Sequence, residues 1–247
     1  MTRLVAAELL KLRTIRATWG YVFTAVVLAA LVTAGTIGSE SQTSRLEPDF
    51  QHRLVVDAAG ATIILALLLG ITLVTNEFRH GTITPTLLVA PRRDRVLGAK
   101  FAAGVATAIA LVATAVIVIV AIALIWLAVL DVPLELGDAA RGAGRVVLSA
   151  AIAGLLGVAV GGVVHAQVAA LVGTLVWLFV AEPLLGGLLG LGDAEGVAEY
   201  LPGAVIFALG DPSSDGLQFW PAVAVGAAYV AGGAVLAALR TGRRDIT

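Results

Sequence analysis

Residues 101–130 read FAAGVATAIALVATAVIVIVAIALIWLAVL and contain no charged side chain. A helix crosses the hydrocarbon core of a bilayer with about 20 apolar residues, so this stretch is long enough to span a membrane at a tilt. The rest of the chain is similar, because 59% of the 247 residues are hydrophobic and only 13% are charged. Soluble domains contain about 25% charged residues. The sequence therefore predicts an integral membrane protein.

Five further apolar stretches accompany this one, separated by segments rich in charged and turn-forming residues. A window of roughly 20 residues places the six spans at residues 19–37, 55–75, 101–130, 146–164, 168–185 and 219–239. The expected fold class is all-α: one polytopic membrane domain, residues 1–247, with six transmembrane helices.

The basic residues set the expected orientation of these spans. Both termini are placed in the cytoplasm by the positive-inside rule, because 12 of the 16 basic residues then lie in cytoplasmic segments. Those twelve are Arg3, Lys11, Arg13, Arg16, Arg79, Arg92, Arg93, Arg95, Lys100, Arg240, Arg243 and Arg244. The excess of arginine over lysine, 14 against two, together with abundant Ala, Gly and Val, is typical of a G+C-rich bacterial genome. We therefore expect a multi-pass protein of the bacterial inner (plasma) membrane.

Residues 1–17 precede the first span and have an amphipathic pattern. On a helical wheel the apolar side chains fall within an arc of roughly 140°, which Glu8 interrupts; they are Leu4, Val5, Leu9, Leu12 and Ile15. The pattern predicts a helix that lies on the inner membrane surface. Lys11, Arg13 and Arg16 would face the anionic lipid headgroups.

The segment of residues 76–100, NEFRHGTITPTLLVAPRRDRVLGAK, is longer than a connection between two spans requires. A polar start leads to an apolar element through Ile83, Leu87 and Leu88, which Pro91 ends. A basic cluster of Arg92, Arg93 and Arg95 follows. From the residues alone, this segment is either a loop held on the membrane surface by its arginines or a docking element for a cytoplasmic partner.

Few polar groups lie within the spans. Asp57 and Glu182 are the ionisable residues there, both near outer ends, and such residues are often functional. With Pro183 they are possible translocation or gating residues. Pro183 is expected to kink its helix, so that GGLLGLG, residues 186–192, forms a short re-entrant turn. The small-residue motifs at 157–161 and 186–190 predict close helix packing, within the monomer or at a subunit interface.

No catalytic or cofactor-binding motif is present in the sequence. There is no cysteine, no G-x-S-x-G, no H-E-x-x-H and no G-x-x-x-x-G-K-[ST] phosphate-binding loop. The three histidines fall in different loops, which argues against a shared metal site. We therefore expect a chain that is not an enzyme and that binds no cofactor or metal itself.

Three motifs together resemble the permease subunit of ABC-2 type exporters, over nearly the whole chain. The opening AELLKLRTIRATW, in residues 1–17, is similar to that family's interfacial elbow helix. The segment of residues 76–100 is similar to its cytoplasmic coupling loop. Glu182-Pro183 and Tyr200-Leu-Pro-Gly203, within residues 182–218, are similar to its outer-leaflet segment.

The resemblance implies an ABC-2 type exporter fold and an ATP-driven exporter whose ATP and Mg are bound by a separate ATPase subunit. The partners would be that ATPase, a second permease subunit, identical or paralogous, and the lipid bilayer, with no nucleic acid. The spans themselves hold few polar groups, and this suits an amphipathic drug, peptide or lipid-like substrate. The ATPase-coupling residues would be Glu77, Phe78, Arg79, His80, Gly81, Thr82, Ile83, Leu87 and Leu88.

Two other functions remain open at this point. An ion-coupled secondary transporter would move its substrate in vesicles without an ATPase, but such proteins use carboxylates at the membrane midplane or paired broken helices. A non-transporting membrane anchor for a cytoplasmic regulator would bind a partner and move nothing. Reconstituted export separates the exporter from both alternatives.

Overall fold

The computed structural model is built of helices and describes residues 2–39, 41, 48–82, 92–132, 136–192, 194–211 and 216–242. Within these residues six helices are long and apolar enough to cross a membrane. They are Arg16–Ser39, Arg53–Arg79, Arg95–Val129, Ala140–Val164, Gln167–Leu191 and Phe219–Arg240. The prediction of an all-α membrane protein with six spans is confirmed.

The helices extend beyond the predicted spans. The elements are α1 Thr2–Thr14, α2 Arg16–Ser39, α4 Pro48–Arg79, α6 Arg93–Val129, α7 Leu136–Val164, α8 Gln167–Val176, the π-helical turn η1 Trp177–Ala181, α9 Glu182–Leu191, α10 Glu195–Ala198, α11 Pro202–Gly210 and α12 Phe219–Gly242. The predicted cytoplasmic loop is therefore shorter than expected, because α4 and α6 continue into it from both sides. Residues 80–92 connect these two helices.

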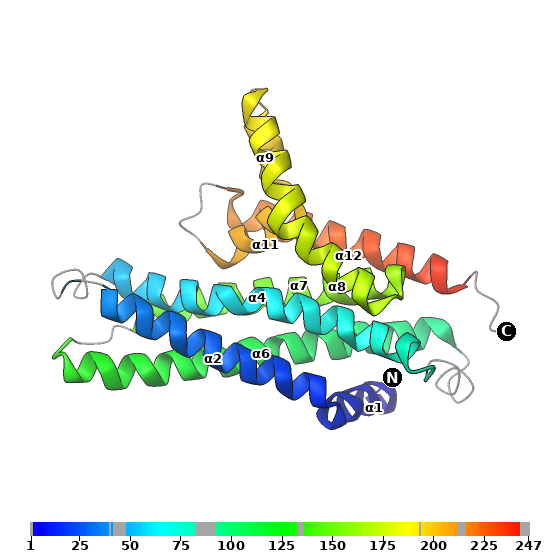
Figure 1. The fold of residues 1–247 in the computed structure, drawn as a ribbon, viewed down its shortest axis with the longest axis horizontal. Helices are drawn as coiled ribbons and strands as arrows, with labels where there is room; N and C mark the ends of the chain where they lie inside the picture. Colours follow the sequence, from blue (N-terminus) through cyan, green and yellow to red (C-terminus); the bar gives the residue numbers. More distant parts are fainter. Residues whose placement is uncertain are drawn as a thin grey trace.

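The two central spans are α4 and α7, which pack along each other. In each of them 67% of the most apolar window is buried, against 22% for α2, 17% for α12 and 11% for the span formed by α8, η1 and α9. Helices α2 and α6 pack on one side of this pair, and α8, α11 and α12 pack on the other (Figure 1). The start of α1 and the end of α12 lie at the same end of the molecule, as an even number of spans requires (Figure 1).

Glycines allow α4 and α7 to approach at backbone distance. A methyl group added to Gly157 of α7 would overlap the carbonyl oxygen of Leu67, and one added to Gly70 of α4 would overlap that of Gly154. At Gly161 the added carbon would lie 2.9 Å from the carbonyl oxygen of Ile71 in α4. The motif at residues 157–161 therefore packs inside the monomer, where small residues let two helix backbones meet.

Pro183 does not break the fifth span. The chain passes from α8 through η1 into α9 without leaving a helical path, and the N–H of Glu182 donates to the carbonyl of Trp177, five residues earlier. Proline has no N–H to donate, and a wider π turn just before it is one way for a helix to continue. The predicted re-entrant turn at residues 186–192 is therefore wrong, because these residues lie in α9 as far as Leu191.

Candidate functional site

Four charged side chains meet where α1, α4 and α6 converge. Glu8 and Lys11 come from α1, Glu77 from the last turn of α4, and Lys100 from the first part of α6. Nζ of Lys11 lies 2.8 Å from Oε1 of both Glu8 and Glu77. Nζ of Lys100 lies 3.1 Å from Oε2 of Glu8 and 2.8 Å from Oε1 of Glu77. We call this group the charge tetrad; its two carboxylates and two ammonium groups sum to zero charge.

Most of the charge tetrad is out of contact with solvent. The side chain of Lys100 is 3% exposed, that of Glu8 7% and that of Glu77 8%, whereas Lys11 is 41% exposed. Removing one charge from water costs several kcal/mol, so each buried member depends on its partners. Oε2 of Glu77 has no hydrogen-bond partner among the described residues. The charge tetrad therefore joins α1 to α4 and α6 through Lys100, Glu8 and Glu77, which are buried, and through the half-exposed Lys11.

The ion pairs shift the pKa values of two members. Burial alone raises the pKa of the Glu8 carboxyl, but the ammonium groups of Lys100 and Lys11 outweigh it and hold that pKa below its usual 4.5. Burial alone lowers the pKa of Lys11, but Glu77 and Glu8 outweigh it and hold that pKa above its usual 10.5. Glu8 and Lys11 are therefore both charged at neutral pH.

The two residues after Glu77 tie the end of α4 to the turn between α7 and α8. The ring of Phe78 packs edge to face against that of His165, with ring centroids 4.2 Å apart. Nη1 of Arg79 donates to Oε1 of Gln167, the first residue of α8, at 3.1 Å. His165 adopts a left-handed backbone conformation with φ 61°, which reverses the chain in this short turn.

Gly81 ends α4 with a left-handed cap. Its φ is 67°, a conformation that glycine adopts without the Cβ penalty of other residues. The N–H of Gly81 donates to the carbonyl of Phe78 at 3.4 Å, and that of Thr82 donates to the carbonyl of Glu77 at 3.0 Å. These two bonds form a Schellman motif and satisfy carbonyls that the helix end would leave unpaired. Glu77 is thus held by both its side chain and its backbone.

A groove of about 680 Å³ opens beside the charge tetrad. It lies between the joint of α1 and α2, the end of α4 and the start of α8. Several predicted coupling residues line it: Glu77, Arg79, His80 and Thr82, together with Arg16 and Gln167. Arg16, Arg79, His80 and Thr82 are exposed. We call it the tetrad groove; it offers basic side chains at its surface and a neutral ion cluster beneath.

The remaining predicted residues of this region fall in three groups. Arg13, Arg92 and Arg95 are exposed. Lys11, predicted to face the membrane surface, is half-exposed and also belongs to the charge tetrad. Ile83, Leu87 and Leu88, and the side chain of Arg93, lie outside what the structure describes.

Glu182 holds the start of α11. Its buried carboxylate accepts the backbone N–H of Gly203 at 3.0 Å and that of Ala204 at 2.6 Å. It also accepts Nε1–H of Trp177 at 2.8 Å. The first N–H groups of a helix have no intrahelical partner and carry partial positive charge, so a carboxylate stabilises them. Glu182, predicted as a possible translocation or gating residue, therefore anchors α11 to the fifth span.

The other end of α11 is held by α7. Arg145 donates from Nε to the carbonyl of Leu209 at 3.3 Å and from Nη2 to that of Ala208 at 3.4 Å. Its guanidinium also lies 4.8 Å from the ring centroid of Phe219. Ser149, one turn further along α7, donates to the carbonyl of Ile206 at 2.6 Å. An acid at the N-terminus and a base at the C-terminus match the dipole of α11.

The two other predicted residues of this group lie at the surface. Asp57 is exposed on the first part of α4. Pro183 is exposed at the start of α9, one residue after the carboxylate that holds α11. The structure therefore does not bring Asp57 into the group formed by Glu182 and α11.

The charge tetrad and the residues that anchor α11 belong to a chain whose described residues include six helices that are long and apolar enough to cross a membrane. The protein is a polytopic membrane protein. No protein-family model matches its sequence, and no curated protein matches it.

The sequence interpretation missed two members of the charge tetrad and both anchors from α7. Glu8 was visible as the one acid that interrupts an apolar helical arc, and Lys100 as one of only two lysines in an arginine-rich chain. Arg145 and Ser149 stand four residues apart, on one face of α7. That spacing is the available signal, although nothing in it identifies α11 as the partner.

Proposed function

We propose that this chain is the membrane-spanning permease subunit of an ATP-driven exporter. ATP is hydrolysed by a separate ATPase subunit that carries the nucleotide and Mg, and the working unit contains a second, identical or paralogous permease. The cargo is an amphipathic drug, peptide or lipid-like molecule that leaves the cytoplasm. The resemblance of the three motifs to ABC-2 type permeases supports this proposal.

The charge tetrad is the observation that carries the proposal. Glu77 and Lys100 stand on either side of the connection of residues 80–92, and Glu8 and Lys11 join them to α1. A force applied to this connection acts on α1, α4 and α6 together, because packed and ion-paired elements move as rigid bodies. An ATPase that binds this connection could therefore move α1, α4 and α6 together.

The tetrad groove supplies the surface for that ATPase. Arg16 and Arg79 line it and are exposed, so an ATPase with an acidic contact surface would match it in charge. Glu77 is buried, and we assign it a positioning role rather than direct contact with the ATPase.

Coupled ATP turnover tests the proposal. The permease, purified together with an ATPase from its native membrane and reconstituted, should stimulate vanadate-sensitive ATP hydrolysis. Arg79→Glu should weaken this stimulation because it reverses a charge in the tetrad groove. Gln167→Ala controls for loss of the bond between Arg79 and Gln167, and Arg53→Glu reverses an exposed charge near the other end of α4. Equal stimulation by wild type and Arg79→Glu would reject the docking assignment.

Labelling of introduced cysteines tests the orientation separately. The chain has no cysteine, so single variants report without background. Thr82→Cys lies beside the tetrad groove and Ser41→Cys follows the far end of α2; both positions are exposed. A membrane-impermeant maleimide on intact cells should label Ser41→Cys, and Thr82→Cys only after permeabilisation. The reverse pattern would place the tetrad groove outside the cell, where a cytoplasmic ATPase could not bind it.

A further inference from the structure

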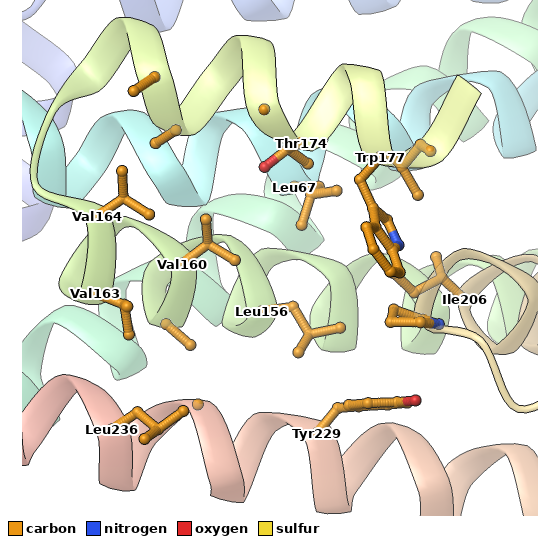
Figure 2. A pocket seen from close by; sticks show the side chains of 17 residues that line it. Leu67, Leu156, Val160, Val163, Val164, Thr174, Trp177, Ile206, Tyr229 and Leu236 are labelled. Carbon is orange, nitrogen blue, oxygen red and sulfur yellow. The ribbon is translucent and has the colours of Figure 1, made fainter. Parts of the chain in front are cut away.

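An apolar cleft of about 480 Å³ lies between α7, α8 and α12 (Figure 2). Its walls come from Leu156 to Val164 of α7, Ala169 to Thr174 of α8 with Trp177 of η1, and Tyr229 to Leu236 of α12. Ile206 of α11 stands at one end, near Trp177 and Tyr229 (Figure 2), and Pro202 of α11 also lines the cleft. We call this space the α8–α12 cleft.

The polar atoms at this end are already paired. Nε1 of Trp177 donates to Glu182, and the hydroxyl of Tyr229 donates to the carbonyl of Tyr200 at 2.8 Å. Water enters a cavity where it finds two or more polar partners, and apolar cavities stay dry. The flanking helices are membrane spans, so hydrocarbon is the medium beside the cleft. Apart from Thr174, the lining between the two ends is apolar, so the occupant is apolar over most of the length of the cleft.

The length of the α8–α12 cleft matches one leaflet. Residues 156–164 and residues 169–177 each extend about 12 Å along their helices at 1.5 Å per residue. They start at the turn between α7 and α8, on the side of the charge tetrad, and end near the middle of their spans. Half of a hydrocarbon core about 30 Å thick is about 15 Å. With these spans centred in the bilayer, the cleft would run from near one membrane surface to near the midplane, with the start of α11 at its inner end.

A positive charge lies one helical turn beyond the end of the cleft that Leu236 lines. Arg240 follows Leu236 by four residues, so it lies on the same face of α12 one turn nearer the membrane surface. Its side chain is exposed. A guanidinium is a favourable partner for a phosphate. The α8–α12 cleft is apolar, is about as long as one leaflet and ends near an arginine. These features are complementary to a phospholipid whose acyl chain lies in the cleft and whose phosphate lies at Arg240.

The geometry points to the α8–α12 cleft as a binding site for one acyl chain of a bilayer phospholipid, from the leaflet on the side of the charge tetrad. The proposed orientation makes that leaflet cytoplasmic. The acyl chain fills space that would otherwise separate α8 from α12, and its tip reaches Trp177 and the start of α11. The site therefore places a lipid against the segment that Glu182 and Arg145 anchor.

Photo-crosslinking in proteoliposomes tests this site. The probe is phosphatidylcholine with a diazirine near the end of one acyl chain, present in both leaflets so that the result does not depend on orientation. Labelling of residues 156–164, 169–177 and 229–236 should saturate at a low mole fraction of probe. Labelling of the exposed face of α2, which includes Phe23 and Leu31, should rise in proportion to the probe.

Gly173→Leu is the blocking variant, because Gly173 lines the cleft and no atom lies within 4 Å of an added Cβ. Gly35→Leu is the matched control, since Gly35 in α2 is equally open and remote from the cleft. Saturable labelling should be lost in Gly173→Leu and kept in Gly35→Leu, with both variants monodisperse after purification. Labelling that stays proportional to the probe in wild type, or that survives in Gly173→Leu, would overturn the proposal.

A second probe tests the headgroup. A diacylglycerol with the same diazirine chain lacks the phosphate, so it should label the cleft more weakly than phosphatidylcholine in the wild type. Arg240→Gln should lower labelling by phosphatidylcholine to the level of the diacylglycerol, whereas Arg13→Gln, an exposed arginine of α1, should not. Equal labelling by the two probes in the wild type would overturn the assignment of a phospholipid.

Discussion

Nζ of Lys100 lies 2.8 Å from Oε1 of Glu77, and this ion pair joins the two helices that flank residues 80–92. Both side chains are buried, and Glu8 of α1 forms a second ion pair with Lys100. The connection between the second and third spans is therefore anchored at both of its ends. Three elements far apart in the sequence share one electrostatic joint.

Lys100→Met should destabilise the protein strongly, because it leaves Glu8 and Glu77 buried with one cation instead of two. Breaking a buried ion pair costs about 3–5 kcal/mol. Lys11→Met, at the half-exposed cation, should have a smaller effect, since solvent screens that pair. Chemical denaturation of the detergent-solubilised variants measures both. A loss for Lys100→Met no larger than that for Lys11→Met would contradict the burial argument.

The stability of the charge tetrad should depend on pH at both extremes. The folded-state pKa of Glu8 is below its usual 4.5, so its contribution is present above pH 4.5 and is lost as the pH falls through the folded value. The pKa of Lys11 is above its usual 10.5, so its contribution is present below pH 10.5 and is lost as the pH rises through the folded value.

Thermal unfolding as a function of pH measures these two limbs. Glu8→Gln should reduce the loss of stability in acid, and Lys11→Met should reduce it in alkali, each relative to the wild type. Parallel curves for the wild type and Glu8→Gln through the acid range would show that Glu8 contributes no proton-linked stability.

Gly157→Ala should destabilise the packing of α4 on α7, because the new methyl group overlaps the carbonyl oxygen of Leu67. Overpacking of this kind costs about 1–3 kcal/mol. Gly20→Ala in α2 meets no atom within 4 Å and should gain up to about 1 kcal/mol from helix propensity. Denaturation midpoints of the two variants should therefore move in opposite directions. A neutral Gly157→Ala would mean that the two helices separate without loss.

Glu182→Ala should loosen the start of α11, because the N–H groups of Gly203 and Ala204 lose their charged acceptor. A hydrogen bond to a charged group is worth about 1.5–3 kcal/mol, so exchange of these two amides should accelerate by about tenfold or more. Trp177→Phe removes one of the three bonds and keeps the carboxylate, so its effect on the same amides should be smaller. Hydrogen exchange read by mass spectrometry measures both effects. Unchanged protection of these two amides in Glu182→Ala would contradict the role of Glu182 as the anchor of α11.

The spans were predictable because each depends on a local property, a run of apolar residues in one segment. Residues 101–130 illustrate this, since no arrangement of neighbours is needed to infer that they cross a membrane. The extension of α4 to Arg79 and of α6 back to Arg93 was not predictable in the same way. Polar residues at those ends become helical because tertiary contacts, above all the pair of Glu77 with Lys100, hold them there.

The candidate site was predictable only in part, for the same physical reason. Glu77 and Glu182 were recognised, Glu77 from a motif and Glu182 as an acid in an apolar span. Their partners come from distant elements: Glu8 lies 69 positions before Glu77 in the chain, and the amide of Gly203 lies 21 positions after Glu182. A single sequence shows which side chains need a partner, but not which distant residue supplies it.

Both lysines of the chain belong to the charge tetrad, and this gives amine chemistry an unusual selectivity. An acylating reagent meets no other side-chain amine. Lys11 is half-exposed to it, whereas Lys100 is buried and should react only when α1 separates from α4 and α6. The rate of acylation at Lys100 relative to Lys11 therefore follows the opening of this joint, without a label having to be introduced.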